Sequence, residues 1–155
     1  MTPTGRFSLI ALIAVLLAAV VSRLPIIAIG PIQPNLVLAV LIACALFTRN
    51  TAFFAALVGV ATLFARPTPF LFDSVSLGIA VAAFVAFAIK QRVVWPDRLG
   101  VVIFALLGTV VTYVVAAPRF IIHHPGLLFL EVAVNIMCSI VCFELFALVA
   151  GRRHE

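Results

Sequence analysis

The sequence predicts an all-α membrane protein, a polytopic bundle of about six transmembrane helices that forms a single domain over residues 1–155. Of the 155 residues, 66% are hydrophobic and 10% are charged, whereas a soluble domain is about 45–50% apolar and about 25% charged. A chain of this length leaves about a third of its unfolded surface exposed, so much of the apolar surface must face membrane lipids. The composition excludes an ordinary soluble domain, a disordered chain and a nucleic-acid-binding module.

Six apolar runs, separated by polar or proline-containing breaks, define the expected helices. A spanning helix needs about 20 apolar residues, so six helices leave room only for short loops and tails. We expect helices at residues 7–24, 35–48, 51–65, 74–89, 99–117 and 127–150. Thr48-Arg49-Asn50 interrupts the apolar stretch from 35 to 65. We favour two short helices there over one broken helix, because a charged residue inside the membrane is costly.

Local signals mark several helix ends. Pro34-Asn35 opens the second helix, and we place Pro34 at its first position, where a missing N–H costs nothing. Asp73 precedes the fourth helix, and its carboxylate is suited to cap the free N–H groups of the first turn. We expect residues 118–126 to form a loop.

The basic residues divide unevenly between the two sides of a six-span bundle. Three fall on one side, namely Arg23, Arg66 and Arg119. Seven fall on the other, namely Arg6, Arg49, Lys90, Arg92, Arg98, Arg152 and Arg153. Because cytoplasmic loops are enriched in Lys and Arg, both termini are expected in the cytoplasm.

Polar residues inside the last apolar run are the first candidates for function, since such groups are rare in lipid and usually face protein or water. Glu131, Asn135, Cys138 and Cys142 follow i, i+4, i+7, i+11 spacing, which places them on one helical face. This stripe is either a contact surface for a partner helix or small ligand, or a packing seam with one interhelical hydrogen bond. Spacing leaves open whether it faces inward or toward a partner.

The other candidate groups have simpler interpretations. Glu144 lies about 140° around the helix from Glu131, and we expect it to snorkel or to pair with Arg152 or Lys90. His123 and His124 lie in the expected loop, far along the chain from the cysteines, whereas structural zinc sites use closely spaced Cys or His ligands. We therefore expect no metal. The sequence also shows no Ser/His/Asp or Cys/His constellation, no paired carboxylates and no Gly-rich phosphate loop, so we expect no cofactor and no enzymatic activity.

Small residues recur at four-residue spacing in two of the expected helices. The fourth helix carries Gly78, Ala82 and Ala86, and the third carries Ala55 and Gly59. Such faces let helices approach closely. They predict either packing inside the bundle or a docking face for another protein.

Several of these strings, together with the six-span layout, resemble the rod shape-determining protein MreD family over most of the chain. The strings are Pro34-Asn35 before the second helix, Gly59 in the third, Ser74-Val75-Ser76-Leu77-Gly78 opening the fourth, and Asn135 in a last helix that ends at Arg152-Arg153.

The resemblance implies a non-catalytic subunit of the bacterial inner membrane that belongs to the cell-elongation machinery. Its implied partners are a bitopic MreC-like scaffold and, through that scaffold, peptidoglycan synthases and actin-like filaments. It also implies a fold similar to the substrate-binding subunits of energy-coupling-factor vitamin transporters, which makes small-molecule binding the alternative function. We favour the assembly function because the outer half has few polar groups, namely Gln33, Asn35, Arg66, Asp73, Arg119, His123 and His124.

Overall fold

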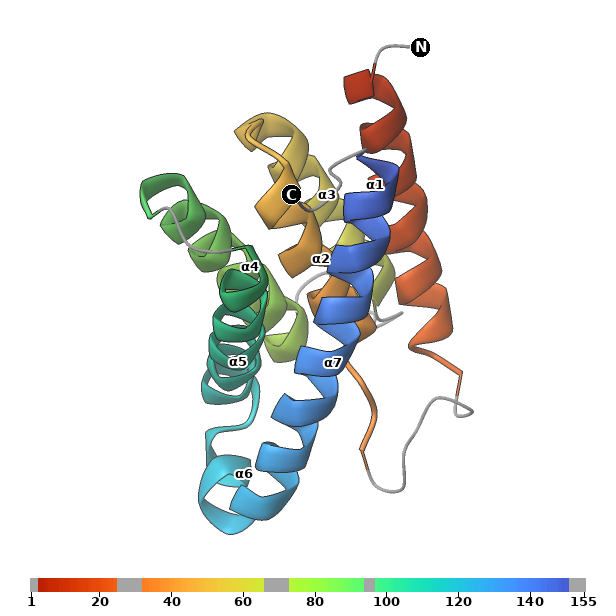
Figure 1. Ribbon diagram of the computed structural model, residues 1–155. Coiled ribbons are helices and arrows are strands. Elements are labelled where there is room, and N and C mark those ends of the chain that lie inside the picture. The colour runs from red at the N-terminus through yellow and green to blue at the C-terminus, as the bar shows by residue number, and fades with distance from the viewer. Residues whose placement is uncertain (1–2, 25–31, 66–72, 94–96, 151–155) are drawn as a thin grey trace.

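The computed structural model describes residues 3–24, 32–65, 73–93 and 97–150, and every element in these ranges is an α-helix (Figure 1). The all-α prediction is therefore confirmed. The helices are α1 (Pro3–Val21), α2 (Leu36–Phe47), α3 (Thr51–Ala65), α4 (Ser74–Arg92), α5 (Asp97–Ala116), α6 (Pro118–His123) and α7 (Pro125–Val149).

Helix α2 is the centre of the bundle. All ten residues from Val37 to Leu46 are buried, and α2 contacts α1, α3, α4, α5 and α7. A helix that is apolar on every side has to be surrounded by other helices or by lipid. Its 12 residues extend about 18 Å, well short of the roughly 30 Å hydrocarbon core, and the neighbouring helices provide its apolar surroundings.

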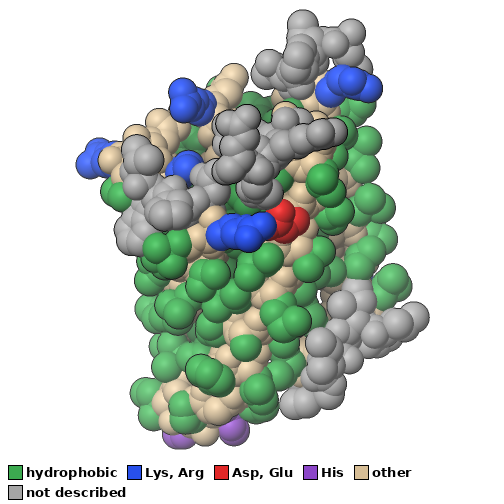
Figure 2. Space-filling view, in the orientation of Figure 1, with side chains coloured by type: hydrophobic (Ala, Val, Ile, Leu, Met, Phe, Trp, Pro, Cys, Tyr) green, Lys and Arg blue, Asp and Glu red, His purple; other side chains and the backbone are tan. Residues whose placement is uncertain are grey.

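The apolar helices fit a membrane protein. Within the described residues, three helices are long and apolar enough to cross a membrane, at Ser74–Arg92, Arg98–Ala116 and Pro125–Val149, while α1, α2 and α3 are shorter apolar helices. Apolar side chains cover the middle of the face in Figure 2, with basic side chains toward one end and histidines at the other. Large apolar side chains such as Leu17, Phe129 and Leu148 are exposed, as expected where the surrounding solvent is lipid.

The division of residues 36–65 agrees with the sequence, whereas several helix boundaries differ from those expected. Residues 36–65 do form two helices, separated at residues 48–50. The expected loop over residues 118–126 was wrong, because Pro118–His123 forms α6 and α7 already starts at Pro125. Both prolines lie in a first turn, where their fixed φ favours a helix and their missing N–H is not needed. Helix α4 also continues three residues beyond the expected end at residue 89.

The helix starts at α2 and α4 depend on side-chain caps. Asp73 Oδ1 accepts the Ser76 N–H at 2.7 Å, which confirms the predicted N-cap. At α2 the N-cap is Asn35, whose Oδ1 accepts the Leu38 N–H at 3.0 Å. The placement of Pro34 at the first helical position was therefore wrong, because the Asn35 cap starts the helix at Leu36.

The two small-residue faces have different surroundings. Gly78, Ala82 and Ala86 are buried in a helix that packs against α5. A Cβ on Gly78 would lie 3.0 Å from both Cα and the carbonyl oxygen of Thr112, so the absence of a side chain permits this close approach. Ala55 and Gly59, by contrast, are exposed on α3. Internal packing is thus confirmed for the α4 face.

We expect Gly78→Ala to lower the free energy of unfolding by about 1–3 kcal/mol, the usual cost of overpacking a close contact. Backbone atoms of Thr112 surround the new methyl group and cannot rotate away. The midpoint of thermal unfolding in detergent measures the change. The matched control is Gly59→Ala, where a Cβ meets nothing within 4 Å. That control should be neutral or gain up to about 1 kcal/mol from helix propensity; equal losses for the two variants would contradict this account.

Candidate functional site

The N-terminus of α2 is joined to α7 by a hydrogen bond between residues 100 positions apart. The backbone N–H of Asn35 donates to Oδ1 of Asn135 at 2.8 Å. The same Asn35 uses its side chain to cap its own helix. Asn135 therefore accepts a donor that the first turn of α2 cannot satisfy by itself.

Asn135 also reaches the third helix of this junction. Its Nδ2 donates to Oγ1 of Thr109 at 3.1 Å, and that hydroxyl donates to the carbonyl of Ala105 at 2.8 Å. Asn135 is 1% exposed and Thr109 is equally buried. The side chain of Asn135 thus faces the interior of the bundle and links α2, α5 and α7.

The remaining residues of the α7 stripe have a graded environment. Glu131, one turn before Asn135, is half-buried, and so are Cys138 and Cys142. Ser139, one turn after Asn135, is fully buried, and its hydroxyl has no hydrogen-bond partner among the described residues. Asn135 and its neighbour Ser139 are therefore buried within the bundle, whereas the other three residues of the stripe remain partly exposed.

A cavity of about 640 Å³ opens beside this stripe, at the end of the bundle where α2, α4 and α7 begin and α1 and α5 end. We call this the cavity end. Both Pro34 and Asn35 line the cavity, as does Thr112, against which Gly78 packs. Its other polar lining comes from Ser22, Arg23, Gln33, Ser76, Tyr113 and Glu131. Three of the residues singled out from the sequence, Pro34, Asn35 and Glu131, thus line one cavity, and Asn135 and Gly78 contact its lining residues Asn35 and Thr112.

Glu131 forms a hydrogen bond across the cavity wall. The hydroxyl of Tyr113 on α5 donates to its Oε2. The Tyr113 ring stacks on Phe120 of α6, with 5.1 Å between centroids and 24° between planes. Carboxylate, phenol and phenyl ring therefore form one continuous part of the lining.

Two longer side chains at the cavity bind backbone carbonyls. The Arg23 guanidinium donates to the carbonyl of Phe64 near the end of α3, and the Gln33 amide donates to the carbonyl of Ser22. Carbonyls near a helix end lack intrahelical partners, so Arg23 also stabilises the end of α3.

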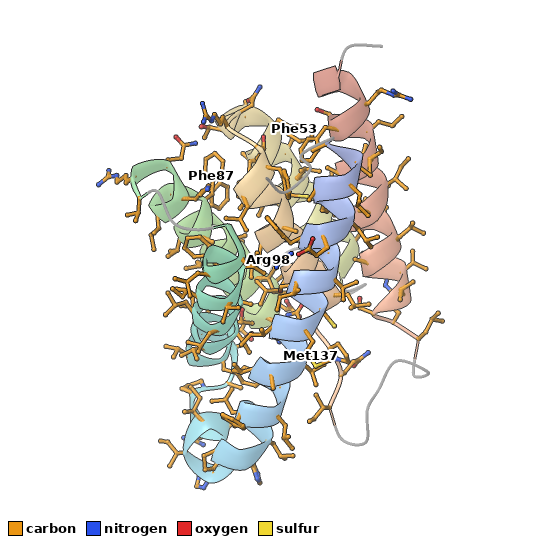
Figure 3. All side chains as sticks on the ribbon, viewed as in Figure 1. Phe53, Phe87, Arg98 and Met137 are labelled. Atoms are coloured by element: carbon orange, nitrogen blue, oxygen red, sulfur yellow. The ribbon has the colours of Figure 1, made fainter. Side chains whose placement is uncertain are left out.

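Glu144 lies near the opposite end of α7 and pairs with Arg98 of α5, whose Nε is 3.1 Å from Oε1. Figure 3 labels Arg98. The two side chains are 36% and 71% exposed, respectively. The sequence analysis expected Glu144 to snorkel or to pair with Arg152 or Lys90. Arg152 lies outside the described residues, as do Arg66 and Arg153. Sequence reasoning missed Arg98 because residue 98 was placed in a loop, whereas α5 already begins at Asp97.

Sequence reasoning also missed the α5 side of the site. The polar side chains on this face carry no charge, so a search for charged groups in the apolar helices does not select them. They are Thr109, Thr112 and Tyr113. Their spacing of three and four residues places them on one face of α5, and Tyr113 is the single tyrosine of the chain. A search for hydroxyl groups on one face of an apolar helix would have found them.

Among the described residues, no three His, Cys, Asp or Glu side chains gather in a group that could hold a metal ion. Glu131 and the hydroxyl and amide groups of the lining can instead form hydrogen bonds and one charge interaction with a polar molecule. Comparison of the chain with protein-family models, curated proteins and solved structures gives no match.

We expect Asn135→Leu to lower the free energy of unfolding by about 1–3 kcal/mol, because the half-buried Asn35 N–H loses its acceptor and the buried Thr109 hydroxyl loses its donor. Thermal unfolding of the purified protein in detergent measures the loss. Ser139→Ala, one turn further along the same face, removes a buried hydroxyl without a described partner and should change stability little. A tolerant Asn135 together with a sensitive Ser139 would contradict the role assigned to this junction.

Proposed function

We propose that this chain is a non-catalytic subunit of the bacterial inner membrane that docks and orients a bitopic MreC-like scaffold in the cell-elongation machinery. Through that scaffold it would be linked to peptidoglycan synthases and actin-like filaments. The resemblance to the MreD family supports the proposal, since its motif residues Pro34, Asn35, Gly78 and Asn135 lie in or next to one cavity.

The observation that carries the docking function is an exposed face of small residues on α3. Ala52, Ala55, Ala56 and Gly59 are all exposed, and a Cβ on Gly59 would meet nothing within 4 Å. Small residues let a second helix approach closely in lipid, where van der Waals packing drives association. The single span of a bitopic partner fits such a face.

We propose that α1, α2, α3, α4, α5 and α7 are the six spans and that both termini face the cytoplasm. The start of α1 and the end of α7 lie at the same end of the bundle (Figure 1). Arg6, Arg49, Lys90 and Arg92 belong to that end, while Arg23 and Arg119 belong to the cavity end. This distribution agrees with the positive-inside rule and directs the cavity away from the cytoplasm.

The cavity favours a second function, a small-molecule-binding subunit of the type found in energy-coupling-factor transporters. Its volume of about 640 Å³ falls in the range of roughly 300–1,000 Å³ typical of ligand sites. Polar side chains converge on it from α4, α5 and α7, whereas the sequence was interpreted as having few polar groups in its outer half.

Cysteine labelling tests the proposed orientation. In a variant whose three native cysteines are replaced by alanine, we expect His124→Cys to react with a membrane-impermeant maleimide in spheroplasts. Arg49→Cys should react only after the membrane is permeabilised. Both positions are exposed in the bundle, so accessibility from one side is the variable measured. Labelling of both cysteines in intact spheroplasts would contradict the topology.

Co-purification tests the docking function. We expect the tagged chain, extracted gently from membranes, to recover a single-span scaffold protein, and Gly59→Leu to reduce that recovery about tenfold by keeping the partner helix at a distance. The matched control is Ala88→Leu, an equally exposed position on α4, which should leave recovery unchanged. Recovery of a transporter ATPase module without any scaffold would overturn the assembly proposal in favour of the second function.

A further inference from the structure

We propose that the cavity binds a small organic cation, with Glu131 as its counter-charge and the stacked rings of Tyr113 and Phe120 as its aromatic wall. This inference rests on the second function proposed above, ligand binding at this site, and specifies the charge of the ligand.

Glu131 supplies the negative charge. It lines the cavity, and it forms no ion pair with any described residue. Among the described residues it accepts a hydrogen bond from the neutral hydroxyl of Tyr113, at Oε2. A half-buried carboxylate is poorly solvated and is stabilised by a positive charge placed next to it. A protonated amine in the cavity provides that charge.

The aromatic pair supplies the second attraction. Tyr113 and Phe120 both line the cavity, and their centroids are 5.1 Å apart. A cation next to the face of an aromatic ring is attracted by the electron density of that face. Because Tyr113 also binds Glu131, one cation can reach the carboxylate and the rings together.

The donor groups at the cavity already have described hydrogen-bond partners. Arg23 and Gln33 donate to the carbonyls of Phe64 and Ser22. The N-termini of α2 and α4, which would otherwise attract an anion, are capped by the side-chain oxygens of Asn35 and Asp73. Arg23 keeps its positive charge, but it is exposed and directed to the end of α3. Glu131 instead lies beside the rings of Tyr113 and Phe120, and the carboxylate and rings together favour a cation over an anion at that part of the lining.

Three phenyl compounds of similar size and different charge test the inference. They are 2-phenylethylammonium, the neutral 3-phenylpropanamide and the anionic 3-phenylpropionate, titrated calorimetrically into the full chain in detergent. We expect the ammonium compound to bind most tightly. Its affinity should fall about 10- to 100-fold in Glu131→Gln, the usual range for a hydrogen bond to a charged group. The matched control is Glu144→Gln, the other acidic residue of α7, and it should keep the wild-type affinity.

Phe120→Leu gives an independent test if Glu131→Gln does not accumulate; it should weaken binding of the ammonium compound several-fold. Equal affinity for the cation and the amide, tighter binding of the anion, or an unchanged affinity in Glu131→Gln would overturn the cation preference and leave ligand binding standing. Native mass spectrometry of protein taken from membranes separates the two proposals. If none of the three probes binds but the protein retains a neutral or anionic molecule, the cation preference alone is overturned. If none of the probes binds and no molecule is retained, both the cation preference and the ligand-binding function are overturned.

Discussion

The structure depends on placing a short, wholly apolar helix at the centre of the bundle while keeping its first turn hydrogen-bonded. Helix α2 is enclosed by its neighbours along its length, and unpaired backbone N–H groups are expensive where water is excluded. The side chain of Asn35 accepts the Leu38 N–H, and the side chain of Asn135 on α7 accepts the Asn35 N–H. Thr109 completes the junction from α5. The three helices are thereby fixed in register by polar contacts that apolar packing alone would not specify.

This junction also explains why polar groups gather at the cavity end. Helices α2 and α4 begin there, so their caps lie there, and α5 turns its hydroxyl face toward the same place. Along α7 the environment changes in steps. Glu131 lines the cavity, Asn135 closes the buried junction, and Glu144 reaches Arg98 near the other end. One helix therefore connects a polar cavity, a dry interior and a charged end.

Small residues serve two purposes in the same bundle. On α4, Gly78 and the alanines that follow it are buried. At Gly78 the helix approaches α5 so closely that Thr112 leaves no room for a methyl group. On α3, the equivalent face is uncovered. Apolar side chains need no cover in lipid, but a smooth face of small residues differs from the bulky Leu, Val and Phe side chains exposed elsewhere. It offers a second helix the shape that favours contact.

Composition and pattern by themselves indicated a helical chain suited to a membrane, favoured two helices over one broken helix in residues 35–65, and predicted that Asp73 caps α4. These features follow from local chemistry: apolar run length, the cost of a charge within lipid, and side-chain capping. Tertiary structure alone decided the inward direction of Asn135, the pairing of Glu144 with Arg98, the burial of one small-residue face with exposure of the other, and the cavity that Tyr113 and Glu131 line. Each of these depends on which helices become neighbours. In a chain whose helices are apolar on nearly every side, hydrophobic periodicity does not identify the inward face, so helix pairing could not be deduced from the sequence.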